Sequence, residues 1–173
     1  MQKNQHLGRL LLCCNNEWLN CCRQRLLKDK NIFCFGLENE KSLKIGICLE
    51  KYFYGNETSI IETRAFNCCW QLYGEKCRQL CYLYLRSPTI PPEQKFTFTN
   101  KCLNNITNNN EELDCVLDRE RILHECFPSC LHWIKNNKNS KRFRPSQYCE
   151  PYAKLMALES CHLPLKIFEN NEN

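Results

Sequence analysis

Apolar residues recur at helical spacing in three segments of this chain. Residues 76–85, 111–125 and 151–158 are rich in good helix formers, and their apolar positions fall three and four residues apart. In the middle segment a buried stripe is expected, made of Leu113, Val116, Leu117, Ile122 and Leu123. Pro128 is expected to end that helix or to open the next, because proline cannot continue a helix but is tolerated in its first turn.

The segments between these helices indicate connectors and not strands. Residues 87–92 hold three prolines and predict a semi-rigid, extended linker, and residues 104–110 hold five asparagines and predict an exposed loop. The chain has only five glycines and few period-two runs, which disfavours a β-sandwich. The pattern therefore predicts an all-α fold.

The cysteine content predicts small modules held together by disulfides, and not one ordinary domain. The 173 residues include 16 cysteines, roughly 9% of the chain, which is the density of a disulfide scaffold. Zinc sites favour cysteine pairs two to four residues apart, with two such pairs per metal, and the gaps here do not follow that pattern. We therefore expect disulfides, an oxidising compartment, and no metal or other cofactor.

The order of the cysteines indicates a repeat. Cys68-Cys69, seven residues, Cys77, three residues and Cys81 resemble a looser opening unit in which Cys13-Cys14 and Cys21-Cys22 are six residues apart. Because Cys77 and Cys81 lie four apart, they share a helix face that bonds to other elements can fix in place.

Grouping by the repeat predicts three tandem segments, 1–67, 68–125 and 126–173, each too small to fold securely on its core alone. Fifteen pairings are open to each set of six cysteines. The expected disulfide cysteines are Cys13, Cys14, Cys21, Cys22, Cys34 and Cys48 in the first segment, Cys68, Cys69, Cys77, Cys81, Cys102 and Cys115 in the second, and Cys126, Cys130, Cys149 and Cys161 in the third.

Two sequons agree with passage through the secretory pathway. Asn56 and Asn105 each begin an N-x-Thr triplet, so both are predicted glycosylation sites on exposed surface. The apolar run at residues 10–14 is too short for a signal peptide, and no segment has the length or apolarity of a membrane span or an anchor signal. The expectation is an internal piece of a larger extracellular or cell-surface protein, or a truncated gene model.

The cysteine spacing from Cys68 to Cys81 resembles the cysteine-knot modules of the reversion-inducing cysteine-rich proteins with Kazal motifs. The order continues through Cys102 to Cys130, and an Arg144-Pro145 pair precedes Cys149 as it precedes a cysteine in that family. Cys13 to Cys48 would be the preceding module, although Cys22 follows Cys21 directly. The resemblance covers most of the chain and is strongest over 68–130; Kazal-like segments are absent.

The resemblance implies binding and not catalysis. Members of that family regulate matrix metalloproteinases and act as co-receptors that present a Wnt ligand to an adhesion receptor, and they are lipid-anchored at the cell surface. A second class stays open, namely another helical, disulfide-rich secreted protein such as a growth-factor-receptor-like domain or a venom-type effector. Full-length transcript sequence would separate the two classes.

Enzymatic and nucleic-acid roles are disfavoured. His124, His132 and His162 stand in no nucleophile or metal motif, and Cys126 to His132 is at most half a zinc site. The net charge of +5 and the basic run from Lys135 to Arg144 are typical of a solvated loop, for which heparan sulfate is a more natural extracellular partner than DNA.

The candidate protein contacts are Trp70 and Tyr73, two aromatic residues between Cys69 and Cys77. Rigid aromatic side chains of this kind are the usual hot spots of interfaces. The competing interpretation is that they fill the core of a small module, which needs its aromatic residues.

Overall fold

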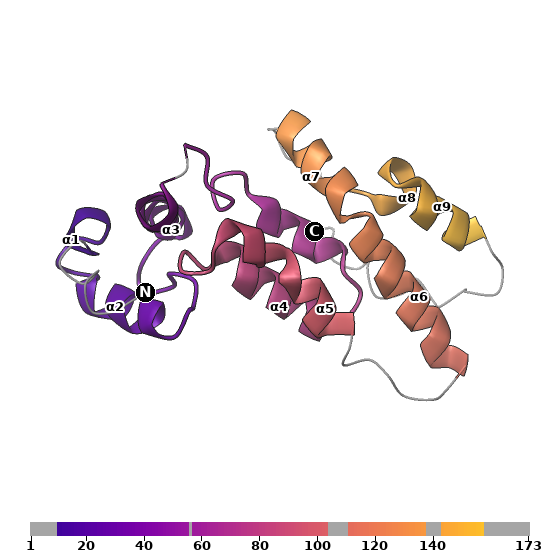
Figure 1. The fold of residues 1–173 in the computed structure, drawn as a ribbon, viewed down its shortest axis with the longest axis horizontal. Coiled ribbons are helices and arrows are strands. Elements are labelled where there is room, and N and C mark those ends of the chain that lie inside the picture. Colours follow the sequence, from indigo (N-terminus) through magenta and orange to yellow (C-terminus); the bar gives the residue numbers. More distant parts are fainter. Residues whose placement is uncertain (1–9, 56, 104–110, 138–142, 158–173) are drawn as a thin grey trace.

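The fold consists of short helices held in two clusters (Figure 1). The structure is a computed structural model and describes residues 10–55, 57–103, 111–137 and 143–157, with the side chains of 11, 103 and 111–117 outside the description. Every regular element in these ranges is an α-helix or a 3-10 helix, and none is a strand, so the predicted all-α, disulfide-rich class is confirmed.

The first cluster is formed by three helices, α1 (Leu10–Cys13), α2 (Leu19–Leu27) and α3 (Asn39–Tyr54). Its core contains Leu26, Ile32, Ile45 and Leu49, all buried. Helix α3 ends at Gly55, whose φ of 64° is the left-handed conformation that glycine adopts without a Cβ penalty. Three disulfides close this cluster, namely Cys13–Cys48, Cys14–Cys22 and Cys21–Cys34. We call it the N-terminal module.

The second cluster contains the remaining elements. They are η2 (Ala65–Gln71), α4 (Glu75–Arg86), η3 (Pro92–Thr97), α5 (Phe98–Leu103), α6 (Glu111–Glu125), α7 (Phe127–Asn136), α8 (Pro145–Tyr148) and α9 (Glu150–Ala157). Its described disulfides are Cys68–Cys130, Cys69–Cys81, Cys77–Cys102 and Cys126–Cys149. We call it the C-terminal module.

The three helices predicted from apolar spacing are confirmed as α4, α6 and α9. Pro128 lies in the first turn of α7, so it opens a helix. Within the predicted stripe of α6, Leu123 is buried, and Ile122 packs against the same core; the other three stripe residues lie outside the described side chains. The loop at 104–110 also lies outside the described residues.

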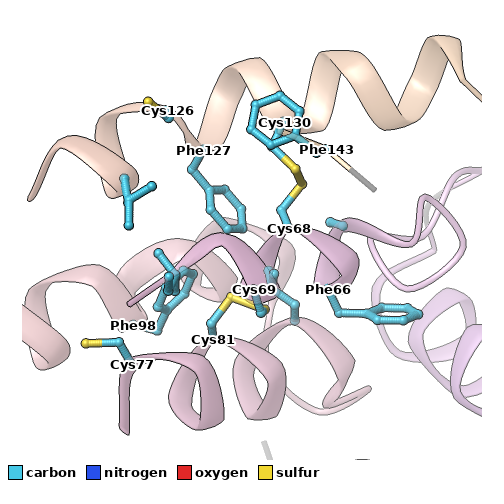
Figure 2. Packing of buried hydrophobic residues seen from close by; sticks show 14 of the residues in the cluster. Phe66, Cys68, Cys69, Cys77, Cys81, Phe98, Cys126, Phe127, Cys130 and Phe143 are labelled. Atoms are coloured by element: carbon cyan, nitrogen blue, oxygen red, sulfur yellow. A yellow bond between two sulfur atoms is a disulfide. The ribbon is translucent and has the colours of Figure 1, made fainter. Parts of the chain in front are cut away.

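The core of the C-terminal module is built on aromatic rings and cystines (Figure 2). The ring of Phe98 is fully buried, and its centre lies 5.6 Å from that of Phe127 in an edge-to-face arrangement. The ring centre of Phe96 lies 6.0 Å from that of Phe127, also edge to face. Edge-to-face pairs of this kind stabilise a core beyond the area they bury. The Cys68–Cys130 bond ties η2 to α7 beside the Phe127 ring.

The expected boundary at 125/126 does not separate two cores. Cys68 bonds to Cys130 and not to a cysteine of the 68–125 segment, and Phe127, Phe143 and Tyr152 share one buried cluster with Phe98. Residues 126–157 therefore complete the C-terminal module. The sequence grouping missed this because consecutive cysteines need not pair with neighbours when a helix folds back onto the start of the module.

Disulfide connectivity is partly repeated between the modules. Counted in chain order, the second cysteine pairs with the fourth and the third with the fifth in both modules. The first cysteine pairs with the sixth, Cys48, in the N-terminal module, but in the C-terminal module Cys68 pairs with Cys130, the eighth, beyond Cys115 and Cys126. Cys115 and Cys161 lie outside the described side chains.

No disulfide crosses between the modules among the described cysteines. The contact is made by apolar packing and by polar groups, and Leu43 of α3 packs against the core of the C-terminal module. Lys95 of η3 and Glu50 of α3 form a buried ion pair with 2.7 Å between Nζ and Oε1, and Thr89 donates a hydrogen bond of 2.9 Å to Asp29. Tyr54 donates another to the carbonyl of Thr89. These contacts set the two modules against each other without a covalent link.

Candidate protein-binding surface

The segment that carries Trp70 is fixed at several points. Cys68 and Cys69 in η2 are buried and bond to α7 and α4, respectively, and Leu72 just beyond is fully buried. Trp70 points the other way and keeps 58% of its surface exposed. An exposed aromatic side chain on such a tethered segment loses little conformational entropy when a partner binds it.

A groove of about 550 Å³ opens beside Trp70. It runs along α4, and its lining includes Glu75, Arg78, Gln79, Tyr82 and Leu83 of that helix. Asn31 of the N-terminal module also lines it. The surface exposed in this groove is mainly apolar, with Glu75 and Arg78 supplying one charge of each sign. Both modules therefore contribute to one concave surface.

The wall of the groove is held from behind by a cluster of rings and one arginine. The Tyr82 ring packs edge-on against Phe66 at 5.6 Å, and the Arg86 guanidinium lies 5.0 Å from the Phe66 ring centre and 5.2 Å from that of Tyr82. Arg86 also donates a hydrogen bond to the Tyr82 hydroxyl. These contacts fix the position of Tyr82 before any partner arrives, which lowers the entropic cost of binding.

Tyr73 does not share the environment of Trp70. It is half-buried, packs against the C-terminal core, and has the Arg119 guanidinium 4.9 Å from its ring centre. The backbone N–H groups of Tyr73 and Gly74 donate to one oxygen of Glu120, at 2.8 and 2.9 Å. This packing favours the core role for Tyr73 and the contact role for Trp70. Sequence spacing alone treated the two residues alike.

The remaining sequence candidates are scattered over the molecule. His132 is exposed and hydrogen-bonded to Asn136, whereas His124 is buried on α6. Cys126 and Cys130, the two thiols of the suggested half zinc site, are both in disulfides. Lys135 and Arg144 at the ends of the basic run are exposed. Asn56, Asn105, His162 and residues 138–142 lie outside the described residues.

Comparison with known families covers both modules at once. The family model for Caenorhabditis elegans Her-1 matches residues 9–153 of this chain. The chain belongs to the Her-1 family. No curated protein and no solved structure matches it.

Membership in the Her-1 family, together with seven described disulfides, indicates an extracellular protein. In the part of the chain that the structure describes, no helix has the length and apolar character that crossing a bilayer requires. The resemblance to the Kazal-motif proteins stays a prediction, as do the metalloproteinase and Wnt roles that it implies.

Proposed function

We propose that this protein is an extracellular binding protein without enzymatic activity, whose groove beside Trp70 receives an apolar segment of a partner protein. The observation that carries the proposal is the 58% exposure of Trp70 on a segment whose neighbours Cys69 and Leu72 are almost completely buried. A small module has strong reason to bury a tryptophan, because each buried indole adds substantially to its core. The exposure of Trp70 beside a largely apolar groove is consistent with a role in contacting a partner.

The partners to test first are those that the family resemblance implies, a Wnt ligand, a matrix metalloproteinase and an adhesion receptor, with a lipid-anchored parent protein at the cell surface. Heparan sulfate is the acidic partner proposed for the basic run that ends at Arg144.

A second proposal is a secreted effector that acts as a two-module unit. The Her-1 family model spans both modules from residue 9 to residue 153, and the groove takes residues from each of them. Because both modules line one binding surface, we expect the two modules to act together as one unit. Separate action of each module within a long repeat array is less favoured.

Replacing Trp70 by Ala tests the binding role. The biotinylated, secreted protein is titrated against immobilised extracellular proteins that include the three candidates. If Trp70 is a hot spot, the variant loses about 2 kcal/mol of binding free energy, roughly a 30-fold rise in Kd, while its secretion and melting temperature match those of the unmodified protein.

Trp133→Ala is the matched control. Trp133 is half-buried and its ring lies 6.0 Å from both Phe143 and Tyr148, so its loss should lower thermal stability and leave the affinity of the folded protein unchanged. Retention of Trp70→Ala inside the cell, or a melting temperature as low as that of the control, would assign Trp70 to the core and refute the proposal.

A further inference from the structure

A second cluster of reactive side chains lies where α4, α5 and α6 meet. It consists of Cys77 in the first turn of α4, Cys102 near the end of α5, and Glu120 and His124 one turn apart on α6. One ligand atom from each of these four residues lies within 4.8 Å of all the others. This cluster is separate from the groove at Trp70.

Two members of the cluster are buried without full hydrogen bonding. Neither ring nitrogen of His124 has a hydrogen-bond partner among the described residues, and neither has Oε1 of Glu120. The other oxygen of Glu120 accepts the N–H groups of Tyr73 and Gly74, which fixes the direction of the carboxylate. Nε2 of His124 and Oε1 of Glu120 lie 3.4 Å apart and pair only with each other, and Nδ1 of the buried imidazole has no hydrogen-bond partner among the described residues. Burying polar atoms with so few partners is unfavourable, and a metal ion between the imidazole and the carboxylate would satisfy both.

The geometry suits a tetrahedral ion. Zn–N and Zn–O bonds of about 2.0–2.2 Å and Zn–S bonds of about 2.3 Å hold neighbouring ligand atoms roughly 3.3–3.8 Å apart. The 3.4 Å between Nε2 of His124 and Oε1 of Glu120 fits this spacing. The Cα atoms of Cys77 and Cys102 are 5.3 Å apart, close enough for both sulfurs to face one ion. Two sulfurs, an imidazole and a carboxylate are ligands that zinc accepts.

We propose that the Cys77–Cys102 pair, in its dithiol form, completes a Zn²⁺ site with Glu120 and His124. A dithiol reductant breaks the S–S bond and is itself oxidised to a disulfide, so that two electrons and two protons pass to Cys77 and Cys102. Binding of Zn²⁺ then releases both thiol protons, and the two thiolates, the Glu120 carboxylate and the neutral His124 ring are the four ligands. Oxidation of the pair expels the ion.

The Cys77–Cys102 bond is the one described disulfide placed for this exchange. No other cystine of the described residues lies in a group of three or more ligating side chains. The neighbouring Cys69–Cys81 bond joins the same helix α4 to η2 and belongs to no such cluster among the described residues. It therefore provides an internal comparison within one module.

The test uses the full chain and Co²⁺ as the spectroscopic probe for Zn²⁺. Dithiothreitol is titrated until two thiols per chain appear, and peptide mapping after alkylation identifies them as Cys77 and Cys102. Co²⁺ should then bind with a stoichiometry of one, give a thiolate-to-cobalt charge-transfer band together with tetrahedral ligand-field bands, and be displaced by Zn²⁺. The oxidised chain should give neither set of bands.

His124→Gln should weaken Co²⁺ binding by at least tenfold, whereas His132→Gln, on the exposed face of α7, should leave it unchanged. Alkylation rates provide a second test on the unmodified chain. Zn²⁺ should slow the alkylation of reduced Cys77 and Cys102, and it should not slow the alkylation of reduced Cys69 and Cys81. The proposal is overturned if the cobalt bands are absent, or if Co²⁺ binds with equal affinity to the His124→Gln variant. It is also overturned if the Cys77–Cys102 bond is reduced only when the helical circular dichroism signal is lost, because the site requires a folded dithiol form.

Discussion

Lys95 is the residue whose environment departs furthest from what its type suggests. Its side chain is completely buried, yet its ammonium reaches Glu50 Oε1 at 2.7 Å, the carbonyl of Ser87 at 2.6 Å and that of Leu85 at 3.2 Å. All three N–H groups are thereby used. Glu50 also accepts the backbone N–H of Ile61 at 3.0 Å. Burial nevertheless lowers the pKa of Lys95, because the charged form loses its hydration.

Lys95→Met is expected to destabilise the protein by about 3–5 kcal/mol, because it leaves the Glu50 carboxylate buried without its counter-charge. Denaturant unfolding measures the loss. Lys51→Met is the control, since Lys51 pairs with Glu62 at 2.7 Å near the surface and should contribute no more than about 1 kcal/mol. Equal losses from the two substitutions would show that the buried pair stabilises the protein no more than the surface pair does.

Tyr54 gives the joint between the modules a dependence on alkaline pH. Burial, aided by the nearby carboxylates of Glu93, Glu50 and Asp29, raises the pKa of Tyr54 to about 12. In the unfolded chain a tyrosine titrates near pH 10, so the unfolded state loses this proton first. The stabilisation from Tyr54 is thus complete below about pH 10 and is lost as pH rises through about 12.

Tyr54→Phe should remove this part of the alkaline loss of stability. The difference between the phenolate absorbance titrations of the unmodified protein and the variant isolates Tyr54, and its midpoint is expected at about pH 12. A midpoint near 10 would mean that the hydroxyl is solvated and does not donate to the Thr89 carbonyl.

At the scale of elements, two adjacent cysteines have different structural roles. Cys68–Cys130 joins η2 to α7 across 62 residues, whereas Cys69–Cys81 joins η2 to α4 across 12. The first bond holds α7 against the aromatic core, and the second holds the middle of α4 against η2 (Figure 2). Loop-closure entropy grows with the length of the closed loop, so the two bonds should differ in their effect on stability.

Removal of Cys68–Cys130 by a double Ser substitution should destabilise the C-terminal module by about 4 kcal/mol, and removal of Cys69–Cys81 by about 3 kcal/mol. Thermal unfolding of the two variants side by side provides the comparison. Because Cys68 and Cys69 are adjacent in η2, the local effects of replacing them by Ser should be similar and largely cancel when the two stability losses are compared. A larger loss from the shorter loop would show that packing strain, and not chain entropy, dominates.

At the scale of the whole molecule, the residues that the structure describes form two covalently closed modules with a non-covalent joint. The described bonds stay within residues 13–48 or within residues 68–149. Peptide mapping without reduction should therefore recover Cys13–Cys48, Cys14–Cys22 and Cys21–Cys34 separately from the bonds of the C-terminal module. A cystine that linked Cys21 or Cys34 to any cysteine beyond residue 67 would contradict this arrangement.

Much of the architecture was open to prediction because it depends on local sequence. The apolar spacing of α4, α6 and α9 and the position of Pro128 reflect helix propensity and steric rules that act over a few residues. The density of cysteines predicted a covalent scaffold, and their spacing predicted a repeat that is consistent with the two disulfide pairings that recur in both modules.

Other features depend on contacts between residues far apart in the chain, and only the tertiary structure decided them. Cys68 pairs with Cys130 because α7 folds back onto η2 around the Phe98 and Phe127 rings, and no spacing rule selects that pairing from the alternatives. In the same way, Trp70 is exposed and Tyr73 is packed because Glu120, on a distant helix, holds the turn between them and α4. The sequence by itself determined the helices and the kind of covalent scaffold, and long-range packing determined which side chains face a partner.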